Sequence, residues 1–391
     1  MPNRYPATPQ WRLSVWYFWY FAHVGAFTPY FTLYLESLDV PAAVIGLMMS
    51  GMLAMRVAAP LLWGSLADRR NEKVPVVRLS AMLSLLCFAV LFVAVQIWPI
   101  AIALAAFAFF WSASLPLVEA LTLAHLVGAV ERYGRVRLWG SVGFIAAVLL
   151  TGMWLDQAAL RSLLWIDLGI LVALAGSAWM LSDPVVARSA TTAPLRWADM
   201  LRRDVLALLV ASLLMAAAHG PFYVFFSIHL VAHGYGKAVV GMLWSLGVVA
   251  EIGVFIAMPH LLRQLSARTI LVSSLALAVV RFALIGWAVD SAPMMLLAQL
   301  FHGATFGAAH AAAVALLNRS FPAAQQARAQ ALYGSFSVAF GGMLGNLAGG
   351  AAWQYLGPEL TFTVGSAFAA MGLAVAWFGL PAARAAAVPV R

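Results

Sequence analysis

Charged side chains interrupt long apolar stretches of this sequence, in places where water is excluded and charge is costly. Arg56, Glu119, Glu251 and Arg281 each stand within a run of mostly apolar residues. Charges in such surroundings are usually retained to pair, to bind a charged solute or to carry protons. No nucleophile stands beside a base, and no cluster has metal-ligand spacing. We therefore expect a binding site rather than an enzyme, with no cofactor and no metal.

Four histidines, His23, His219, His302 and His310, also lie inside apolar runs. Histidine changes its protonation near physiological pH, as a proton-coupled cycle requires. His302 and His310 lie roughly 80° apart around a helix, so both can border one cavity. We predict proton-coupling roles for Glu251, Arg281, His302 and His310. Glu251 and Arg281 are expected to form an ion pair that can release and bind a proton. The alternative is that the pair and the histidines only hold neighbouring helices together.

A second set is predicted to bind substrate. Arg56 stands near the middle of its apolar run, and its guanidinium offers two parallel donors to a carboxylate. The alternative is that Glu119 neutralises it internally. Trp244 could stack on a substrate ring, and His219 could contact substrate or a proton.

The composition shows which elements must position these residues. Of 391 residues, 64% are hydrophobic and 9% are charged, so a soluble chain could not cover its surface. Apolar segments of about 18–25 residues, each long enough to span a bilayer, recur along the chain. We predict an all-α membrane protein with twelve transmembrane helices, at 12–35, 43–66, 76–96, 99–126, 136–155, 162–181, 205–230, 239–260, 269–288, 291–317, 327–350 and 359–380.

Basic residues predict the orientation of these helices. Most of the 23 lysines and arginines fall in segments that share one side if both termini are cytoplasmic. Their distribution in loops argues against nucleic acid as a partner. We expect a multi-pass protein of a bacterial-type inner membrane, with the lipid bilayer, protons and a small-molecule substrate as its partners. The single cysteine, Cys87, excludes an intramolecular disulfide.

The chain repeats itself at an offset of 195 residues, since 44–50 aligns with 239–245 and keeps Val, Gly and Ser in place. Internal duplication is common in secondary transporters. We predict two pseudo-symmetric six-helix bundles, 1–181 and 205–391, joined by a cytoplasmic linker at 182–204. Because one chain would hold a complete two-half carrier, we expect a functional monomer.

The stretch Gly64-Ser-Leu-Ala-Asp68-Arg69-Arg70 stands at the end of the second apolar segment. It resembles the loop signature of the major facilitator superfamily, which implies a conformational latch formed by Gly64, Asp68 and Arg69. Leu117-Val-Glu119-Ala and the stretch 133–141 are similar to the lactose permease group. That resemblance implies that Glu119 and Arg137 bracket the substrate, and that Glu251, Arg281 and His302 belong to a proton-coupling network. This chain differs from that group at Arg56 and has no acid three residues after His302.

A further resemblance is carried by the stretches 135–142 and 242–252, by His219 and by the pair His302 and His310. These residues look like those of the phenylpropionate permease family. It implies proton-coupled import of an aromatic carboxylate such as 3-phenylpropionate by alternating access. One alternative is a galactoside-like sugar symporter, for which Arg56 would be dispensable. An efflux antiporter is a weaker alternative, because the fifth segment lacks the proline of the antiporter signature.

Overall fold

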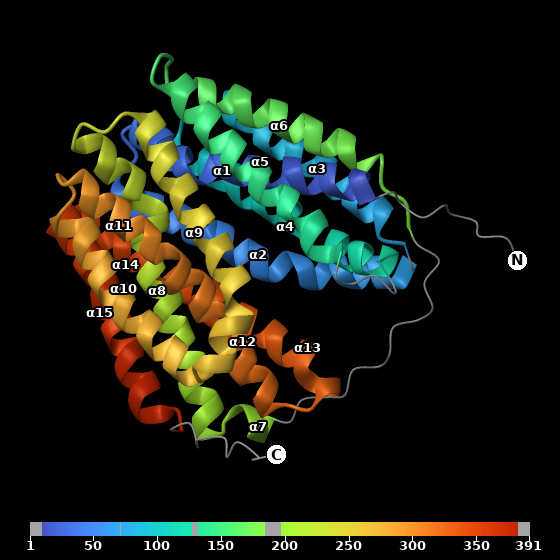
Figure 1. Cartoon of the computed structure of the whole chain (residues 1–391). Helices are drawn as coiled ribbons and strands as arrows, with labels where there is room; N and C mark the ends of the chain where they lie inside the picture. Colours follow the sequence, from blue (N-terminus) through green and yellow to red (C-terminus); the bar gives the residue numbers. More distant parts are fainter. Residues whose placement is uncertain (1–9, 71, 127–131, 184–196, 382–391) are drawn as a thin grey trace, which may run out of the picture. The chain divides into compact units, whose positions relative to one another are not determined.

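The computed structural model describes residues 10–70, 72–126, 132–183 and 197–381, without the side chains at 60, 61, 68, 70, 197 and 198. Over these residues the chain is 88% helical and has no strand (Figure 1). The first helices are α1 Gln10–Glu36, α2 Ala42–Arg70, α3 Val74–Ala89, the short η1 Val90–Phe92, α4 Ile97–His125, α5 Tyr133–Leu155 and α6 Ser162–Ala178. The rest are α7 Trp197–Met200, α8 Arg203–Ala232, α9 Lys237–Gln264, α10 Ala267–Trp287, α11 Ala292–His302, η3 Gly303–Ala308, α12 Ala309–Ser320, α13 Ala323–Leu332, η4 Tyr333–Phe340, α14 Gly341–Leu356 and α15 Pro358–Gly379.

Every predicted segment coincides with a helix or with a continuous run of helices. Nine helices in the described part of the chain are long and apolar enough to cross a membrane. The other three predicted segments correspond to α1, to the shorter α6 and to the run α13–η4–α14. The predicted all-α membrane fold is therefore confirmed, while the count of twelve spans and the cytoplasmic termini stay predictions.

The chain divides into two compact units. Unit 1 comprises residues 1–190 and 223–245, and unit 2 comprises residues 191–222 and 246–391. In unit 1, α1 packs against α5 and α6, while α3 and α4 pack together and α2 packs on α4. In unit 2, α10 packs against α15, α11 and α12, and α14 packs on α15. The predicted division into 1–181 and 205–391 stays a prediction, and most of the predicted linker lies outside the described residues.

Glycines let the first helix of each predicted half touch another backbone. In unit 1, a Cβ on Gly25 of α1 would collide with Phe144 of α5, and one on Gly143 of α5 would collide with Phe18. In unit 2, Gly220 of α8 meets the backbone at Gly345 of α14 in the same way. Gly25 and Gly220 are related by the 195-residue offset of the sequence repeat. Such small-residue contacts bring membrane helices together where the hydrophobic effect between them is weak.

Within unit 1, the turn after α5 caps the N-terminus of α9. The Asp156 carboxylate accepts backbone N–H bonds from Lys237 at 2.6 Å and from Ala238 at 3.0 Å. The Tyr30 hydroxyl lies 2.8 Å from the Val148 carbonyl oxygen and 3.1 Å from that of Lys237. A carboxylate at this end of a helix satisfies free N–H groups and complements the helix dipole.

Replacing Asp156 with alanine should lower the free energy of unfolding by about 1–2 kcal/mol, because two helix N–H groups lose their acceptor. Thermal unfolding in detergent measures the change. Gln157→Ala, on the next exposed position, is the control and should change stability by less than about 0.5 kcal/mol. Equal stability of the two variants would show that the cap contributes nothing.

Candidate functional site

An exposed arginine stands over a stack of aromatic rings in unit 1. The guanidinium carbon of Arg56, on α2, lies 5.6 Å from the ring centroid of Trp111 on α4. Tyr20 of α1 stacks on Trp111 with 4.5 Å between centroids, and Trp16 stacks on Tyr20 at 5.0 Å. A cation over an indole face is held by the ring quadrupole, which leaves its N–H donors available. Among the side chains that the structure describes, none forms an ion pair with Arg56.

The second arginine of this region has an acidic neighbour. Arg137 of α5 lies 3.8 Å above the Phe21 ring centroid. The Glu119 carboxyl of α4 interacts with the Arg137 guanidinium and with the Tyr133 hydroxyl. The Glu119 carboxyl is thus within electrostatic range of Arg137, and among the described side chains neither Glu119 nor another acid forms an ion pair with Arg56.

Tyr20 brings the predicted first-half residues together. Its buried hydroxyl lies within electrostatic range of Arg56, Glu119 and Arg137. Sequence reasoning missed both Tyr20 and Trp111, because aromatic residues are abundant in this chain and few patterns separate packing from binding. The rings of Trp16, Tyr20 and Trp111 form a stack that we call the aromatic platform. Arg56, Glu119 and Arg137, three predicted substrate-binding residues, lie near its central ring, Tyr20.

Arg281 of α10 forms the polar centre of unit 2 and is fully buried. Its Nε donates to the Ala298 carbonyl oxygen at 2.8 Å, and its Nη1 donates to the Thr305 hydroxyl at 3.2 Å. Its guanidinium carbon lies 4.4 Å from the Phe222 ring centroid. Thr305 reaches it from η3, a π-helical turn that begins directly after His302. Such wide turns re-aim side chains and are frequent at functional sites.

The hydrogen bonds of His219 define its tautomer. Its Nε2 lies 3.3 Å from Nη1 of Arg281, and its Nδ1 lies 2.8 Å from the Met215 carbonyl oxygen. Guanidinium is only a donor and a carbonyl is only an acceptor. Nε2 must therefore accept and Nδ1 must donate, which makes His219 a neutral imidazole while both bonds stand.

Nitrogen NMR of histidine-labelled protein at neutral pH should show His219 with a protonated Nδ1 and a bare Nε2. Arg281→Met should release this constraint and shift the ring toward a mixture of tautomers, because Nε2 loses its donor. A protonated Nε2 in the unaltered protein would contradict the assigned bonds. His233, whose Nδ1 also bonds a carbonyl oxygen four residues back, gives an internal reference signal.

The π-helical turn follows a pair of buried polar residues on α11. Gln299 is fully buried, and neither of its amide atoms bonds a described residue. His302 is 6% exposed, and its ring stacks on Phe306. Both pack against Gly247 of α9, where a Cβ would lie 3.4 Å from Gln299 Oε1 and 3.3 Å from His302 Cδ2. Gln299 was missed, although its place one turn before His302 could have revealed it.

Two proton-coupling candidates remain, Glu251 and His310. Glu251 of α9 is half-buried, and a Cβ on Gly307 of η3 would lie 3.2 Å from its Cγ. The proposed ion pair of Glu251 with Arg281 stays a prediction. His310 is exposed on α12, with its Nδ1 3.3 Å from the Tyr333 hydroxyl.

Trp244 packs against residues of α8 in unit 1. Its indole N–H donates to the Ser227 hydroxyl at 3.1 Å, and its ring meets Tyr223 and Phe226. With its donor engaged, Trp244 can offer a ligand only part of its ring. Its substrate-binding role stays a prediction.

The predicted latch lies at the end of α2. A Cβ on Gly64 would meet no described atom within 4 Å, so none of the described residues packs closely against this glycine. The Asp68 side chain lies outside the described residues, and Arg69 is exposed. The latch itself stays a prediction.

The comparisons with known proteins agree on a family. Residues 10–364 match the model of the MFS_1 like family. The chain is 30% identical over 353 residues to a protein named as a probable 3-phenylpropionic acid transporter of Escherichia coli strain K12, covering 88% of this chain and 91% of that relative. It is also 27% identical over 361 residues to the maltose permease of Geobacillus stearothermophilus, covering 90% of each.

A solved structure shares the fold. The crystal structure of the nucleoside transporter NupG superposes with a TM-score of 0.82 at 17% identity, covering 94% of this chain and 97% of that one. At that identity the likeness shows the fold and not the substrate. Together with the helical units described above, these matches show that the chain belongs to the MFS_1-like family of the major facilitator superfamily and is a transporter of that fold.

Proposed function

We propose that this transporter moves a small aromatic carboxylate, such as 3-phenylpropionate, together with protons and by alternating access. The observation that carries the proposal is Arg56, an exposed guanidinium over the Trp111 ring that no described acid neutralises. A carboxylate would accept two parallel N–H bonds from such a group. A phenyl ring attached to that carboxylate could pack against the neighbouring aromatic side chains.

The named relatives point to two candidate substrates, an aromatic acid and a sugar. The relative at 30% identity is named as a probable 3-phenylpropionic acid transporter. That acid has a carboxylate for Arg56 to bind and a ring that could pack on the nearby aromatic side chains. The relative at 27% identity is a maltose permease, which favours a sugar as the second candidate. A neutral sugar would have no use for the charge of Arg56 and would depend on neutral hydrogen bonds and stacking instead.

Uptake into proteoliposomes tests the proposal. Purified protein is reconstituted, an inward proton gradient is imposed, and labelled 3-phenylpropionate, its neutral amide, maltose and a galactoside are compared. We expect saturable uptake of the acid that an uncoupler abolishes, with little uptake of the amide. Uptake of either sugar with none of the acid would replace the proposal with the sugar symporter, and acid uptake insensitive to the uncoupler would remove proton coupling.

A further inference from the structure

A histidine and an aspartate from distant parts of the chain meet inside unit 1. Nδ1 of His23 on α1 lies 3.0 Å from Oδ1 of Asp167 on α6. Their exposed fractions are 2% and 0%, and Asp167 is the one charged residue in the sequence of α6. The pair is enclosed by aromatic rings that contact the imidazole, those of Phe27, Phe88, Phe107 and Trp111.

These surroundings restrict the protons that the pair can hold. With two exchangeable protons it is neutral overall, either as imidazolium with carboxylate or as imidazole with carboxylic acid. Removing one proton leaves neutral imidazole beside carboxylate, with a net charge of −1. An unbalanced charge is costly in a buried apolar site, so release of the proton requires a compensating cation nearby or contact with water.

A cation shares one of these rings with the pair. Trp111 lies 5.3 Å from the His23 ring centroid and 5.6 Å from the Arg56 guanidinium. His23 is the titratable group that bonds the Asp167 carboxyl directly, at 3.0 Å. From α3 and α4 the pair faces Phe88, Phe107 and Trp111, and on α1 the neighbouring titratable group is Tyr20, which stacks on Trp111. Arg137 of α5 lies over Phe21, which points to a different face of α1.

We propose that His23 and Asp167 form a proton-binding site whose proton is coupled to the occupancy of Arg56. This inference rests on the proposed carboxylate transport. While Arg56 is empty, its positive charge favours the anionic pair, which has released its proton. A bound carboxylate neutralises Arg56 and removes that compensation, so the pair takes up one proton. Anion and proton then bind together, and by linkage each strengthens the binding of the other by the same factor.

The histidine of the second half lacks this capacity. His219 lies one residue from the repeat position of His23, but its partner is the Arg281 guanidinium rather than a carboxylate. Its Nε2 accepts a bond from that group and cannot hold a proton while the bond stands. The two units thus carry related histidines with opposite partners, and of these two histidines only His23 shares its bond with a carboxylate.

Asp167→Asn tests the inference, because an amide keeps the shape of the carboxylate and cannot exchange the coupled proton. Two readouts are compared in proteoliposomes with 3-phenylpropionate. The first is exchange of labelled for unlabelled acid without a proton gradient, and the second is accumulation driven by an inward proton gradient. We expect Asp167→Asn to keep exchange within about threefold of the unaltered protein and to reduce accumulation at least tenfold. His23→Gln should give the same separation of the two readouts.

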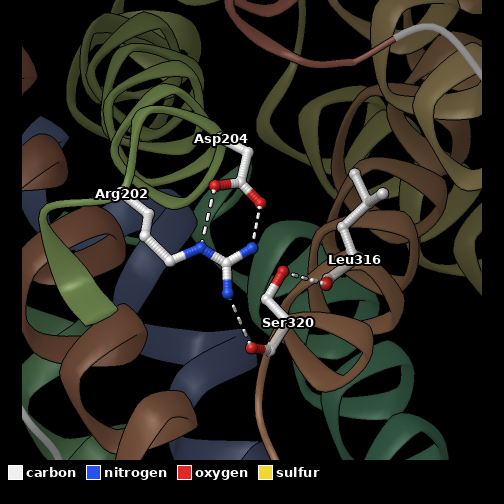
Figure 2. Close-up of polar contacts among 4 residues, drawn as sticks. All are labelled: Arg202, Asp204, Leu316 and Ser320. Carbon is white, nitrogen blue, oxygen red and sulfur yellow. Dashed lines mark hydrogen bonds and ion pairs between the residues drawn. The ribbon is translucent and has the colours of Figure 1, made fainter.

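Asp204→Asn is the matched control. Asp204 pairs with Arg202 at 2.7 Å, and Arg202 also reaches the Ser320 carbonyl oxygen at the end of α12 (Figure 2). This substitution also removes a carboxylate from an ion pair, but in unit 2 and at a site where Asp204 is 30% exposed. It should leave both readouts unchanged.

Proton uptake on substrate binding, followed with a pH indicator in weakly buffered detergent solution, gives a second test in the unaltered protein. We expect about one proton taken up for each 3-phenylpropionate bound, and none in Asp167→Asn or His23→Gln. Accumulation by Asp167→Asn equal to that of the unaltered protein would overturn the inference, and so would binding without proton uptake in the unaltered protein. No accumulation by the unaltered protein would instead be a failure of the proposed function. If Asp167→Asn does not fold, His23→Gln and the indicator measurement decide.

Discussion

Arg56→Gln is expected to raise the Kd for 3-phenylpropionate about 100-fold. Two charge-assisted hydrogen bonds from the guanidinium to the carboxylate are lost, and the glutamine amide returns one neutral bond. A net loss of about 2.7 kcal/mol corresponds to that factor. Arg56→Lys should fall between the two, because an ammonium keeps the charge but not the two parallel donors. Equilibrium binding in detergent measures the change without depending on any proton gradient.

The neutral amide of the same acid separates charge recognition from packing. Binding of 3-phenylpropionamide should differ by less than about threefold between Arg56→Gln and the unaltered protein, because no carboxylate is present to lose. Arg268→Gln is the matched control, since Arg268 in unit 2 also lies 5.6 Å from a tryptophan ring, that of Trp377. It should leave the affinity for the acid unchanged. Equal losses for acid and amide in Arg56→Gln would show that the arginine only supports the platform.

The helices were predictable because the length of an apolar segment can be read directly from the sequence. Each predicted segment could be placed from hydropathy, and the structure has a helix or helix run at every one. Contacts between side chains on different helices were harder to predict. His23 and Asp167 are separated by 144 residues, and no spacing rule links two helices that meet only after folding. Asp167 could still have been noticed as a lone acid in an apolar segment.

The contacts of Arg281 were also only partly predictable from the sequence. Its depth indicated a buried role, and it is fully buried. Its bond to Thr305, however, depends on the π-helical turn after His302, which the period of an ordinary α-helix does not reveal. The sequence also predicted that Arg56 binds the substrate. It did not predict that Arg56 lies over the Trp111 ring, because the two residues are on different helices, α2 and α4.

The contact between α1 and α5 leads to the second large effect, a loss of stability in Gly25→Ala. A Cβ there would lie 3.0 Å from both Cα and the carbonyl carbon of Phe144, and closer still to its oxygen. Backbone atoms cannot turn away as a side chain can, so the two helices must separate. We expect a loss of about 3 kcal/mol in the free energy of unfolding. Gly143→Ala should act similarly, because its Cβ would lie 2.8 Å from the carbonyl carbon of Phe18.

Gly169→Ala separates this steric effect from the general effect of removing a glycine. Gly169 lies in α6 of the same unit, and a Cβ there would meet no described atom within 4 Å. This variant should be as stable as the unaltered protein or up to about 1 kcal/mol more stable, because alanine favours the helix. Since α1 carries Tyr20 and His23 and α5 carries Arg137, moving the two helices apart also moves the binding residues relative to one another. Gly25→Ala should therefore lose 3-phenylpropionate binding even at temperatures where it stays folded. A Gly25→Ala protein as stable as Gly169→Ala, with unchanged binding, would show that the close contact holds neither the fold nor the site.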